Sequence, residues 1–599
     1  MTTRQDPDQT PHPSGSPREH LLKDDVVPHP ALDVALGEPP EANEPRRPLD
    51  LVVFGVTAAI AVAFVVWGFV STASLADVSG DALSGTMKYL GWLFVLASSG
   101  FVVFAIWLGL GRFGTIPLGR DDDEPEFRTA SWVAMMFSAG MGIGLMFFGV
   151  NEPLTFFADE TGYAPPGSAG LPASERAELA MAQTLFHWTF HPWAIYAVVG
   201  LAIAYGVFRK GRSQLISSAF VPLLGHRAEG PAGKVIDMLA IFATLFGSAA
   251  SLGIGALQIS SGLQIVGDLG EVGNGVLVGI IAVLTACFVV SAVSGVARGI
   301  QWLSNTNMVL AVALAAFVFV VGPTMFILNM VPTSMAEYVQ ELPGMSGRTN
   351  AQGAEVATWL SYYTVFYWAW WISWTPFVGM FIARISRGRT IRQFVTGVLL
   401  VPSLVSLVWF AVFGGSAIKL QMDGEQLYES GGAEQQLFTL LEQFPWATAT
   451  SVLVMVLVAI FFVSGADAAS IVMGSLSQRG AIEPRRLPVI FWGVATGAVA
   501  AVMLLVGGED ALNGLKNITI VAAVPFVFVM VGLCVALVKD LLQDPLIVRR
   551  DYARTAVHEA VITGVTEHGD DFALAVERSD GNGTSGRRDK EAGDDSGTR

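Results

Sequence analysis

The feature that most constrains this chain is a succession of separate apolar runs, each roughly 20 residues long, through most of its 599 residues. A run of that length can cross the hydrocarbon core of a bilayer as an α-helix. Hydrophobic residues make up 52% of the chain and charged residues only 14%, whereas soluble proteins carry about a quarter charged residues. The sequence therefore predicts one large membrane domain built from spanning helices.

We predict twelve spanning helices, and the charge of the loops supports that count. Alternate loops are rich in Lys and Arg, as at Arg209–Arg212 and Arg384–Arg392, while the intervening loops carry few. Positive loops stay on the cytoplasmic side during insertion, so both termini are predicted to be cytoplasmic. The predicted spans are Leu51–Val70, Tyr89–Leu110, Thr129–Gly149, Thr184–Val207, Ile236–Leu257, Gly275–Val293, Leu303–Met330, Val356–Ala383, Phe394–Gly415, Ala447–Ser470, Val489–Val506 and Ile518–Val538.

Both ends of the chain are polar. Residues 1–48 and roughly 551–599 are rich in Asp, Glu, Gly, Pro or Ser and lack periodic apolar residues, which predicts largely disordered tails. We divide the chain into a cytoplasmic N-terminal tail at 1–48, a membrane domain at 49–545 and a cytoplasmic C-terminal tail at 546–599. The formal net charge of −16 argues against a nucleic-acid partner.

Glycines interrupt the middle of the third predicted span. Gly140, Gly142 and Gly144 alternate with Met141 and Ile143, and glycine weakens a helix. A weakened helix leaves backbone carbonyls free to face a ligand, and irregular backbone at membrane depth is tolerated where it lines a cavity. The alternative interpretation is close packing of helices through small residues.

Tryptophan is concentrated in the eighth predicted span. Trp370 and Trp374 are one helical turn apart, Trp371 lies beside their face, and Trp368 is a fourth within seven residues. Pro376 follows and removes a backbone donor, so we expect a kink there. An aromatic cluster without nearby carboxylates suits a cation whose charge is spread over methyl groups, each ring contact contributing roughly 0.5–2 kcal/mol. The alternative is a bulky packing core.

Three further features admit more than one interpretation. His187 and His191 have a spacing that can bind zinc, but no third ligand is evident and we interpret both as structural. Asp467 is the main charged residue within a span, and it is either functional or a cap near the cytoplasmic end. Apolar residues with helical spacing in Val331–Met345 predict a short amphipathic helix at the outer interface.

At these residues the chain resembles the betaine/carnitine/choline transporter family, most closely its glycine betaine symporters. The most specific part is Phe366–Thr390, which contains Trp-Ala-Trp-Trp-Ile-Ser-Trp-Thr-Pro-Phe. The glycine stretch Gly140–Gly144 and the aromatic stretch Leu185–Tyr196 are the second and third matches, and the resemblance extends from about Leu51 to Gln543.

The resemblance implies a fold. It implies an all-α polytopic membrane protein with two N-terminal helices followed by two inverted, LeuT-like repeats of five helices, at about 129–330 and 356–540. The opening helices of the two repeats, with Gly140–Gly144 and with Pro376, would both be interrupted. Broken helices in matching positions mark the central site of a transporter. Members of the family are typically homotrimers in the cell membrane.

The resemblance also implies a substrate site. The aromatic residues that would form a cage for a trimethylammonium group are Trp188, Tyr196, Trp370, Trp371 and Trp374. The backbone of Gly140, Met141, Gly142 and Gly144 would approach the substrate carboxylate. Family members that favour choline or carnitine often have an acidic residue where this chain has Gly144. A zwitterion brings its own negative charge, so Gly144 favours glycine betaine.

Sodium coupling follows from the same resemblance. One ion would lie between the third and tenth helices, with ligands from Ser138, Met141, Phe461 and Ser464. A second ion would involve Thr244, Ser248 and the ring of Phe377. The chain departs from the sodium-coupled pattern where Ser464 is followed by Gly465, because two adjacent hydroxyl residues are usual there. No Arg or Lys occurs between Ile236 and Ile265 to replace an ion.

The leading hypothesis is uptake of a compatible solute by alternating access, with glycine betaine as substrate and sodium as coupling ion. No cofactor besides that ion is expected. Uptake of ectoine, proline betaine or choline, by proton coupling or by exchange, is the alternative. An osmosensor that does not transport and a membrane enzyme are further hypotheses. The enzyme would need a convergent set of His, Asp, Glu or Cys in the bilayer, which the sequence lacks.

Overall fold

The computed structural model describes residues 48–140, 142–158, 163–268, 273–294, 297–429, 432–507 and 511–575. Across these ranges the chain is helical and forms no β-strand, with a single isolated bridge between Pro117 and Thr390. The chain divides into one compact unit that ends at Leu541 and a second that begins at Leu542. The first unit contains the membrane helices, so the expected all-α polytopic class is confirmed.

The helices of the first unit follow the predicted spans with some differences in length. In chain order they are α3 Leu51–Val70, α4 Thr72–Leu110, α5 Thr129–Gly140, α6 Ile143–Ala158, α7 Ala173–Trp188, α8 Phe190–Ala204, η1 Tyr205–Arg209, η2 Ser217–Phe220, α9 Val221–Leu224, η3 Gly225–Glu229, α10 Pro231–Gly267, α11 Asn274–Ser294, α12 Ala297–Val321, α13 Thr324–Ser346, η4 Asn350–Gln352, α14 Ala354–Tyr362, α15 Thr364–Arg384, α16 Ile391–Met422, α17 Gln436–Glu442, α18 Ala447–Ser477, α19 Arg486–Gly507 and α20 Ala511–Leu542.

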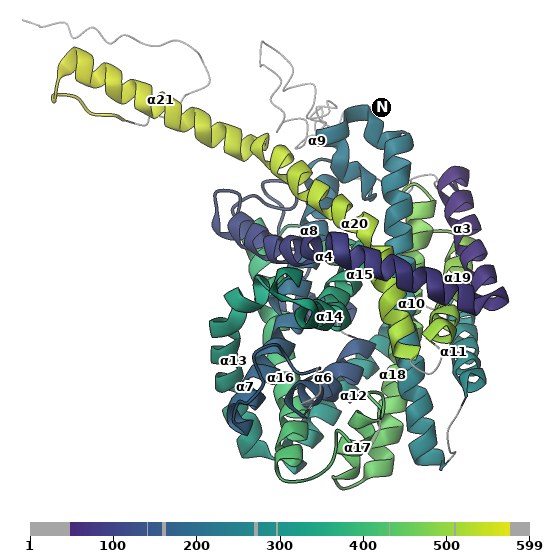
Figure 1. The fold of residues 1–599 in the computed structure, drawn as a ribbon. Coiled ribbons are helices and arrows are strands. Elements are labelled where there is room, and N and C mark those ends of the chain that lie inside the picture. Colours follow the sequence, from purple (N-terminus) through teal and green to yellow (C-terminus); the bar gives the residue numbers. More distant parts are fainter. Residues whose placement is uncertain are drawn as a thin grey trace, which may run out of the picture. The chain divides into compact units, whose positions relative to one another are not determined.

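Nine helical segments within the described ranges are long and apolar enough to cross a membrane, and a tenth results if α12 and α13 are counted together. The pairs α5–α6 and α14–α15 are outside that set. Each of these pairs consists of two shorter helices. The count of twelve spans therefore stays a prediction. α15 packs against α8 and α10, while α6 packs against α16 and α7 (Figure 1).

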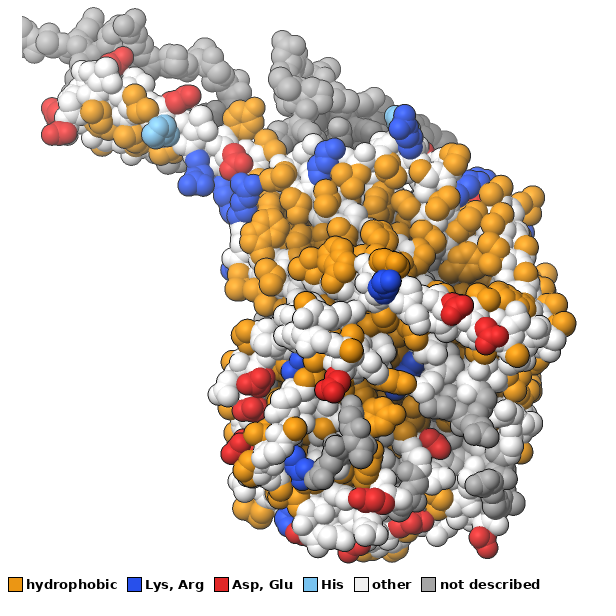
Figure 2. Space-filling view, in the orientation of Figure 1, with side chains coloured by type: hydrophobic (Ala, Val, Ile, Leu, Met, Phe, Trp, Pro, Cys, Tyr) orange, Lys and Arg blue, Asp and Glu red, His pale blue; other side chains and the backbone are white. Residues whose placement is uncertain are grey.

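The surface of the first unit carries an apolar band of the kind that lipid requires. Figure 2 shows hydrophobic side chains gathered over one face around α4, where Leu96, Val103 and Leu110 are exposed. Lys and Arg side chains lie toward the end of this face near α9, and Asp and Glu gather toward the opposite end. An apolar belt between polar ends is typical of a membrane-embedded surface.

The breaks in the central helices lie partly where the sequence predicted them. α5 ends at Gly140 and α6 begins at Ile143, which matches the expected interruption in the glycine stretch. The expected break at Pro376 is wrong, because α15 continues through that proline. The chain breaks instead at Tyr363, between α14 and α15, where φ is −125° and ψ is −85°. A membrane helix tolerates proline when neighbouring helices support it.

Support for α15 at this level comes from α8. A Cβ atom at Gly379 would lie 3.1 Å from the backbone nitrogen of Gly200, so the two helix backbones approach closely. The hydroxyl of Thr375, next to the proline, donates to the carbonyl of Ile195 at 3.1 Å. α15 is therefore supported by α8 next to its proline.

Three other expectations need correction. The predicted span Leu303–Met330 ends early, because α12 stops at Val321 and α13 leaves it at 110°. The predicted short helix at Val331–Met345 is part of α13, which is 23 residues long. The C-terminal tail is not disordered throughout, since α21 spans Pro545–His568 in the second unit. The N-terminal tail lies outside the described residues up to position 47.

Candidate functional site

Four tryptophans and one tyrosine meet where α7, α8 and α15 come together. Trp188 is the last residue of α7 and Tyr196 lies on α8. The chain breaks between these two helices at Thr189. Pro192 follows three residues later, in the first turn of α8, where a missing N–H removes no helical bond. All five side chains are at least nine-tenths buried. The remaining three are Trp370, Trp371 and Trp374 on α15.

The rings touch one another in edge-to-face and stacked pairs. The centroids of Trp188 and Trp371 are 5.0 Å apart at an interplanar angle of 74°. Tyr196 meets the same ring edge-on at 6.3 Å, and Trp370 stacks on it at 4.7 Å. Trp374 lies 6.5 Å from Trp371 at 83°. The five predicted aromatic residues thus form one cluster with Trp371 at its centre.

Each indole N–H of the cluster is bonded within the protein. Trp370 Nε1 donates to Ser251 Oγ, and Trp374 Nε1 donates to the carbonyl of Gly247, both at 3.0 Å and both on α10. Trp371 Nε1 donates to the carbonyl of His187 at 3.0 Å. Because a buried N–H must find an acceptor, these bonds fix the ring orientations and occupy the indole donors.

The glycine stretch adjoins these rings. A Cβ atom at Gly144 would lie 2.8 Å from ring atoms of both Trp188 and Trp370, so only glycine fits between the two indoles. A Cβ atom at Gly142 would lie 3.9 Å from Trp374, which is ordinary contact. Gly140 ends α5, and Met141 lies outside the described residues. The helix therefore breaks within the glycine stretch, and Gly144 also makes a close contact with two indoles, whereas the approach of this backbone to a ligand stays a prediction.

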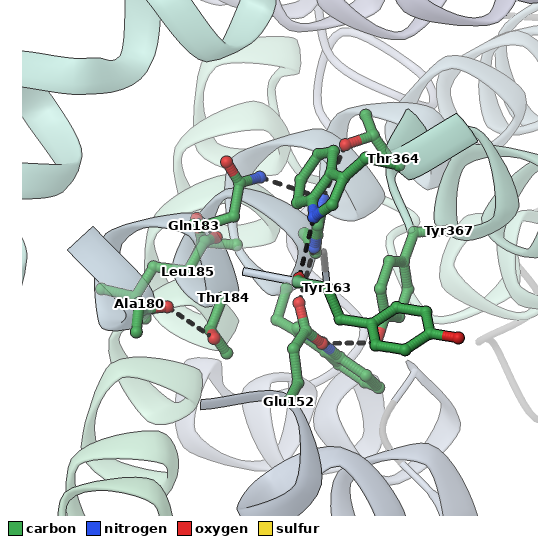
Figure 3. A network of polar contacts seen from close by, with 12 residues as sticks. Glu152, Tyr163, Ala180, Gln183, Thr184, Leu185, Thr364 and Tyr367 are labelled. Atoms are coloured by element: carbon green, nitrogen blue, oxygen red, sulfur yellow. Dashed lines mark hydrogen bonds and ion pairs between the residues drawn. The ribbon is translucent and has the colours of Figure 1, made fainter. Parts of the chain in front are cut away.

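A carboxylate also reaches the cluster, which the sequence analysis did not anticipate. Glu152 on α6 is completely buried, and its Oε2 accepts from Trp188 Nε1 at 2.7 Å. The same oxygen accepts from the hydroxyl of Tyr367, and Oε1 accepts from His187 Nδ1 at 2.5 Å (Figure 3). The expectation of an aromatic cluster without a nearby carboxylate is therefore wrong. The sequence did contain a signal for this site, because Glu152 is an ionisable residue in an otherwise apolar helix.

The hydrogen bonds continue from Glu152 toward the loop after α13. The second ring nitrogen of His187 lies 2.9 Å from Thr364 Oγ1 and 3.1 Å from Gln183 Nε2. Gln183 Oε1 accepts from Arg348 at 2.8 Å. His187 is thus a bonded structural histidine, as expected. Among the described residues, no three His, Cys, Asp or Glu side chains form a group that could hold a metal ion.

Comparison with known proteins decides the family. The model of the betaine/carnitine/choline family of transporters matches residues 52–546, nearly the whole chain. This chain belongs to the betaine/carnitine/choline transporter family. The chain is a transporter rather than an enzyme.

Curated relatives of the transporter agree with this assignment. The betaine/ectoine transporter LcoP of Corynebacterium glutamicum is 44% identical over 92% of this chain and 86% of its own. The glycine betaine transporter OpuD of Bacillus subtilis is 44% identical over 82% of this chain and 94% of its own. A glycine betaine/proline/choline/ectoine transporter of Vibrio parahaemolyticus is 40% identical over 82% and 86%.

The residues expected at one sodium site lie on the transporter's α10 and α15. Thr244 and Ser248 are one turn apart on α10, and Thr244 Oγ1 donates to the carbonyl of Ala240. Ser248 Oγ is buried and has no hydrogen-bond partner among the described residues. Phe377 packs edge-on against Trp374 at 5.3 Å. The N–H of Trp374 bonds to Gly247, the neighbour of Ser248, so the two helices are joined at this level.

The residues expected at the other sodium site lie at the break between α5 and α6 and on α18. A Cβ atom at Gly142 would lie 3.8 Å from the ring of Phe461, so the break faces α18. Ser464 Oγ lies 3.3 Å from the carbonyl of Phe461 and donates to it. The side chain of Ser138 is not among those described.

The neighbours of Ser464 are Gly465 and, one turn further along, Asp467. A Cβ atom at Gly465 would have no described atom within 4 Å, so the described residues leave room for a larger side chain there. Asp467 lies inside α18 and is buried, and its Oδ2 has no hydrogen-bond partner within the described part of the chain. Its interpretation as a helix cap is therefore wrong.

Proposed function

We propose that this transporter takes up glycine betaine in symport with sodium, and that the cluster of Trp188, Tyr196, Trp370, Trp371 and Trp374 binds the trimethylammonium group. One observation carries the proposal. The indole N–H groups of the cluster are bonded within the protein, so a ligand would be recognised there by the rings rather than by indole donors. A trimethylammonium group has no N–H to satisfy and is attracted to such faces, at roughly 0.5–2 kcal/mol for each ring.

A zwitterion suits the surroundings of the cluster better than a simple cation does. Gly144 brings backbone close to the rings without a side chain, and an acidic residue there would collide with Trp188 and Trp370. Backbone N–H groups near a helix start are suited to a carboxylate, since the helix dipole favours negative charge there. α6 begins at Ile143, within this stretch, which supports binding of the betaine carboxylate at the glycines.

Sodium coupling is supported by oxygen atoms at two levels near the cluster. Ser248 Oγ is a buried hydroxyl without a partner in the described part of the chain, and a bound ion would explain a buried polar atom of this kind. Ser464 with the carbonyl of Phe461 offers a second pair of oxygens beside the helix break. The transporter would lie in the cell membrane with both termini in the cytoplasm, in line with the charge of its loops.

The deciding experiment for the substrate uses the full chain in proteoliposomes. Uptake of labelled glycine betaine is measured with an inward sodium gradient and with potassium in its place. We expect concentrative uptake that depends on sodium. Uptake that is unchanged in potassium would remove the sodium coupling, and a proton gradient then becomes the next arm of the test.

The same proteoliposomes rank the alternative substrates. Ectoine, proline, choline and carnitine are offered as competitors of labelled betaine. We expect betaine itself to compete best and choline weakly. Stronger competition by ectoine than by betaine would reassign the principal substrate, because ectoine also is a compact zwitterion.

The cluster is tested by Trp374→Leu against Trp368→Leu. Trp368 lies on the same helix and is equally buried, but its ring stacks on His191 at 4.7 Å, away from the cluster. We expect Trp374→Leu to weaken betaine binding by about tenfold or more, which corresponds to loss of one or two ring contacts. Equal effects of both variants would count against the cluster as the substrate site.

A further inference from the structure

The buried carboxylate of Glu152 has a role that its hydrogen bonds define. Three groups donate to it, from Trp188, Tyr367 and His187, and Lys or Arg is not among the donors. An indole N–H can only donate. Three donors converging on two oxygens fit an ionised carboxylate, which only accepts.

The protonation of His187 follows from the next bonds in the network. A guanidinium has no acceptor, so the Gln183 atom that meets Arg348 is the carbonyl oxygen. The Gln183 amide nitrogen then donates to His187 Nε2, which therefore accepts and carries no proton. The Thr364 hydroxyl, 2.9 Å from the same nitrogen, is then a donor to it as well. The remaining ring proton is on Nδ1 and points to Glu152. His187 is neutral in this arrangement, and the charge of Glu152 is not cancelled by it.

This charge lies directly behind one wall of the cluster. Trp188 lies between the carboxylate and Trp371. Its N–H donates to Glu152, and its ring packs edge-to-face against the ring of Trp371, with the centroids 5.0 Å apart. A hydrogen bond to an anion holds the indole in one orientation and makes its ring faces more negative. Attraction between opposite charges is also stronger in a buried site, where water screens them less.

We propose that Glu152 is a positioning residue of the cage and the fixed counter-charge for the substrate cation, acting through Trp188. This inference rests on the proposed binding of a trimethylammonium group at the cluster. Under this inference, Glu152 on α6 recognises the positive charge of the ligand, in addition to the recognition of its shape by the rings. The same carboxylate, through Tyr367, ties α6 to α15, so the charge and the rings keep their relative positions.

The test separates charge recognition from a merely structural role by using two ligands of one shape. Glycine betaine and 3,3-dimethylbutanoate share a carboxylate and a branched head, but the second has a carbon where betaine has its cationic nitrogen. Both are measured as competitors of labelled betaine in proteoliposomes containing wild type or Glu152→Gln. Glu355→Gln, an exposed carboxylate on α14, is the control for loss of one charge.

We expect Glu152→Gln to weaken the binding of betaine by about tenfold. The binding of 3,3-dimethylbutanoate should be unchanged or tighter, because only betaine loses an attraction to the carboxylate. Equal weakening of both ligands, or an unchanged ratio, overturns the inference. Absence of betaine binding in wild type would instead refute the proposed function. The two failures are therefore distinguishable in one data set.

A second variant serves if Glu152→Gln does not fold. Trp188→Phe keeps an aromatic ring and the carboxylate but removes the N–H that joins them. We expect Trp188→Phe to weaken betaine binding by about threefold to tenfold. In this variant, Glu152→Gln should then reduce betaine affinity less than it does in wild type. Additive effects of the two substitutions would show that Glu152 does not act through Trp188, and would overturn the positioning role.

Discussion

Gly144 of α6 lies so close to Trp370 of α15 that a Cβ atom on it would be 2.8 Å from the indole ring. The two helices therefore meet at the cluster through a glycine that cannot be replaced without movement of a ring. We expect Gly144→Ala to weaken betaine transport by about tenfold, because overpacking of this kind costs about 1–3 kcal/mol.

Gly142→Ala is the matched control, since its Cβ atom would meet ring atoms only at 3.8–3.9 Å. We expect the control to retain affinity close to that of wild type in the same uptake measurement. Similar losses in both variants would show that flexibility of the glycine stretch, and not the space beside Trp370, sets the affinity.

Gly465 offers the opposite case, a glycine with open space around its missing side chain. We expect Gly465→Ser to place a second hydroxyl next to Ser464 and to lower the KM for sodium about two- to tenfold, the range of one added polar contact. The measurement is betaine uptake as a function of sodium concentration. An unchanged sodium KM would show that this part of α18 does not bind the coupling ion.

Ser248 tests the other set of oxygens. Its hydroxyl is buried without a partner among the residues that the structure describes, so removal by Ser248→Ala should not destabilise the protein. We expect this variant to raise the sodium KM about tenfold at unchanged thermal stability. Ser406→Ala removes an equally unpartnered hydroxyl from α16 and serves as control. A sodium KM that responds equally in both variants would contradict a specific ion site at Ser248.

Asp50 provides a pH-dependent prediction at the membrane surface. Burial raises the pKa of its carboxyl, but the hydrogen bond and charge of Lys234 and the backbone N–H groups of Val52 and Val53 outweigh burial and hold the pKa below its usual value of 3.8. A lowered folded-state pKa stabilises the protein above pH 3.8 and ceases to do so as pH falls through the folded-state value.

We therefore expect Asp50→Asn to lower the melting temperature in detergent by about 1–2 °C at pH 7, and the difference from wild type to vanish near pH 2–3. Thermal unfolding scans across this range measure it. Asn still caps α3, so the difference reports the ion pairs of Asp50 with Lys234 and Arg479. A difference that stays constant with pH would exclude the carboxylate charge as its source.

Much of the fold could be predicted because a membrane imposes a simple length rule. Each apolar run must cover the bilayer core, so spans such as Leu51–Val70 are visible without any knowledge of packing. The breaks were harder to predict. Pro376 is the obvious local signal, yet α15 is supported there by α8, and the chain breaks at Tyr363, where the local sequence has no comparable marker.

The aromatic residues of the candidate site could be predicted from the sequence, but the hydrogen bond between Trp188 and Glu152 could not. Helical spacing places Trp370, Trp371 and Trp374 together, because residues three and four apart share a face. Glu152 and Trp188 are 36 positions apart in the chain, and their hydrogen bond depends on how α6 packs against α7. No periodicity reports such a contact, which is why the carboxylate behind the cluster emerged only from the structure.

The hydrogen bonds that the indole N–H groups make within the protein have a consequence for unmethylated amino acids. A primary ammonium brings three N–H bonds that must leave water. Two acceptors beside the rings, Ser251 Oγ and the carbonyl of Gly247, already accept from Trp370 and Trp374, whereas the Tyr196 hydroxyl has no partner within the described residues. If the cluster is the substrate site, we expect glycine to lose hydration that these acceptors do not fully replace. Glycine, although smaller than betaine, would then be disfavoured by its N–H groups rather than by its size.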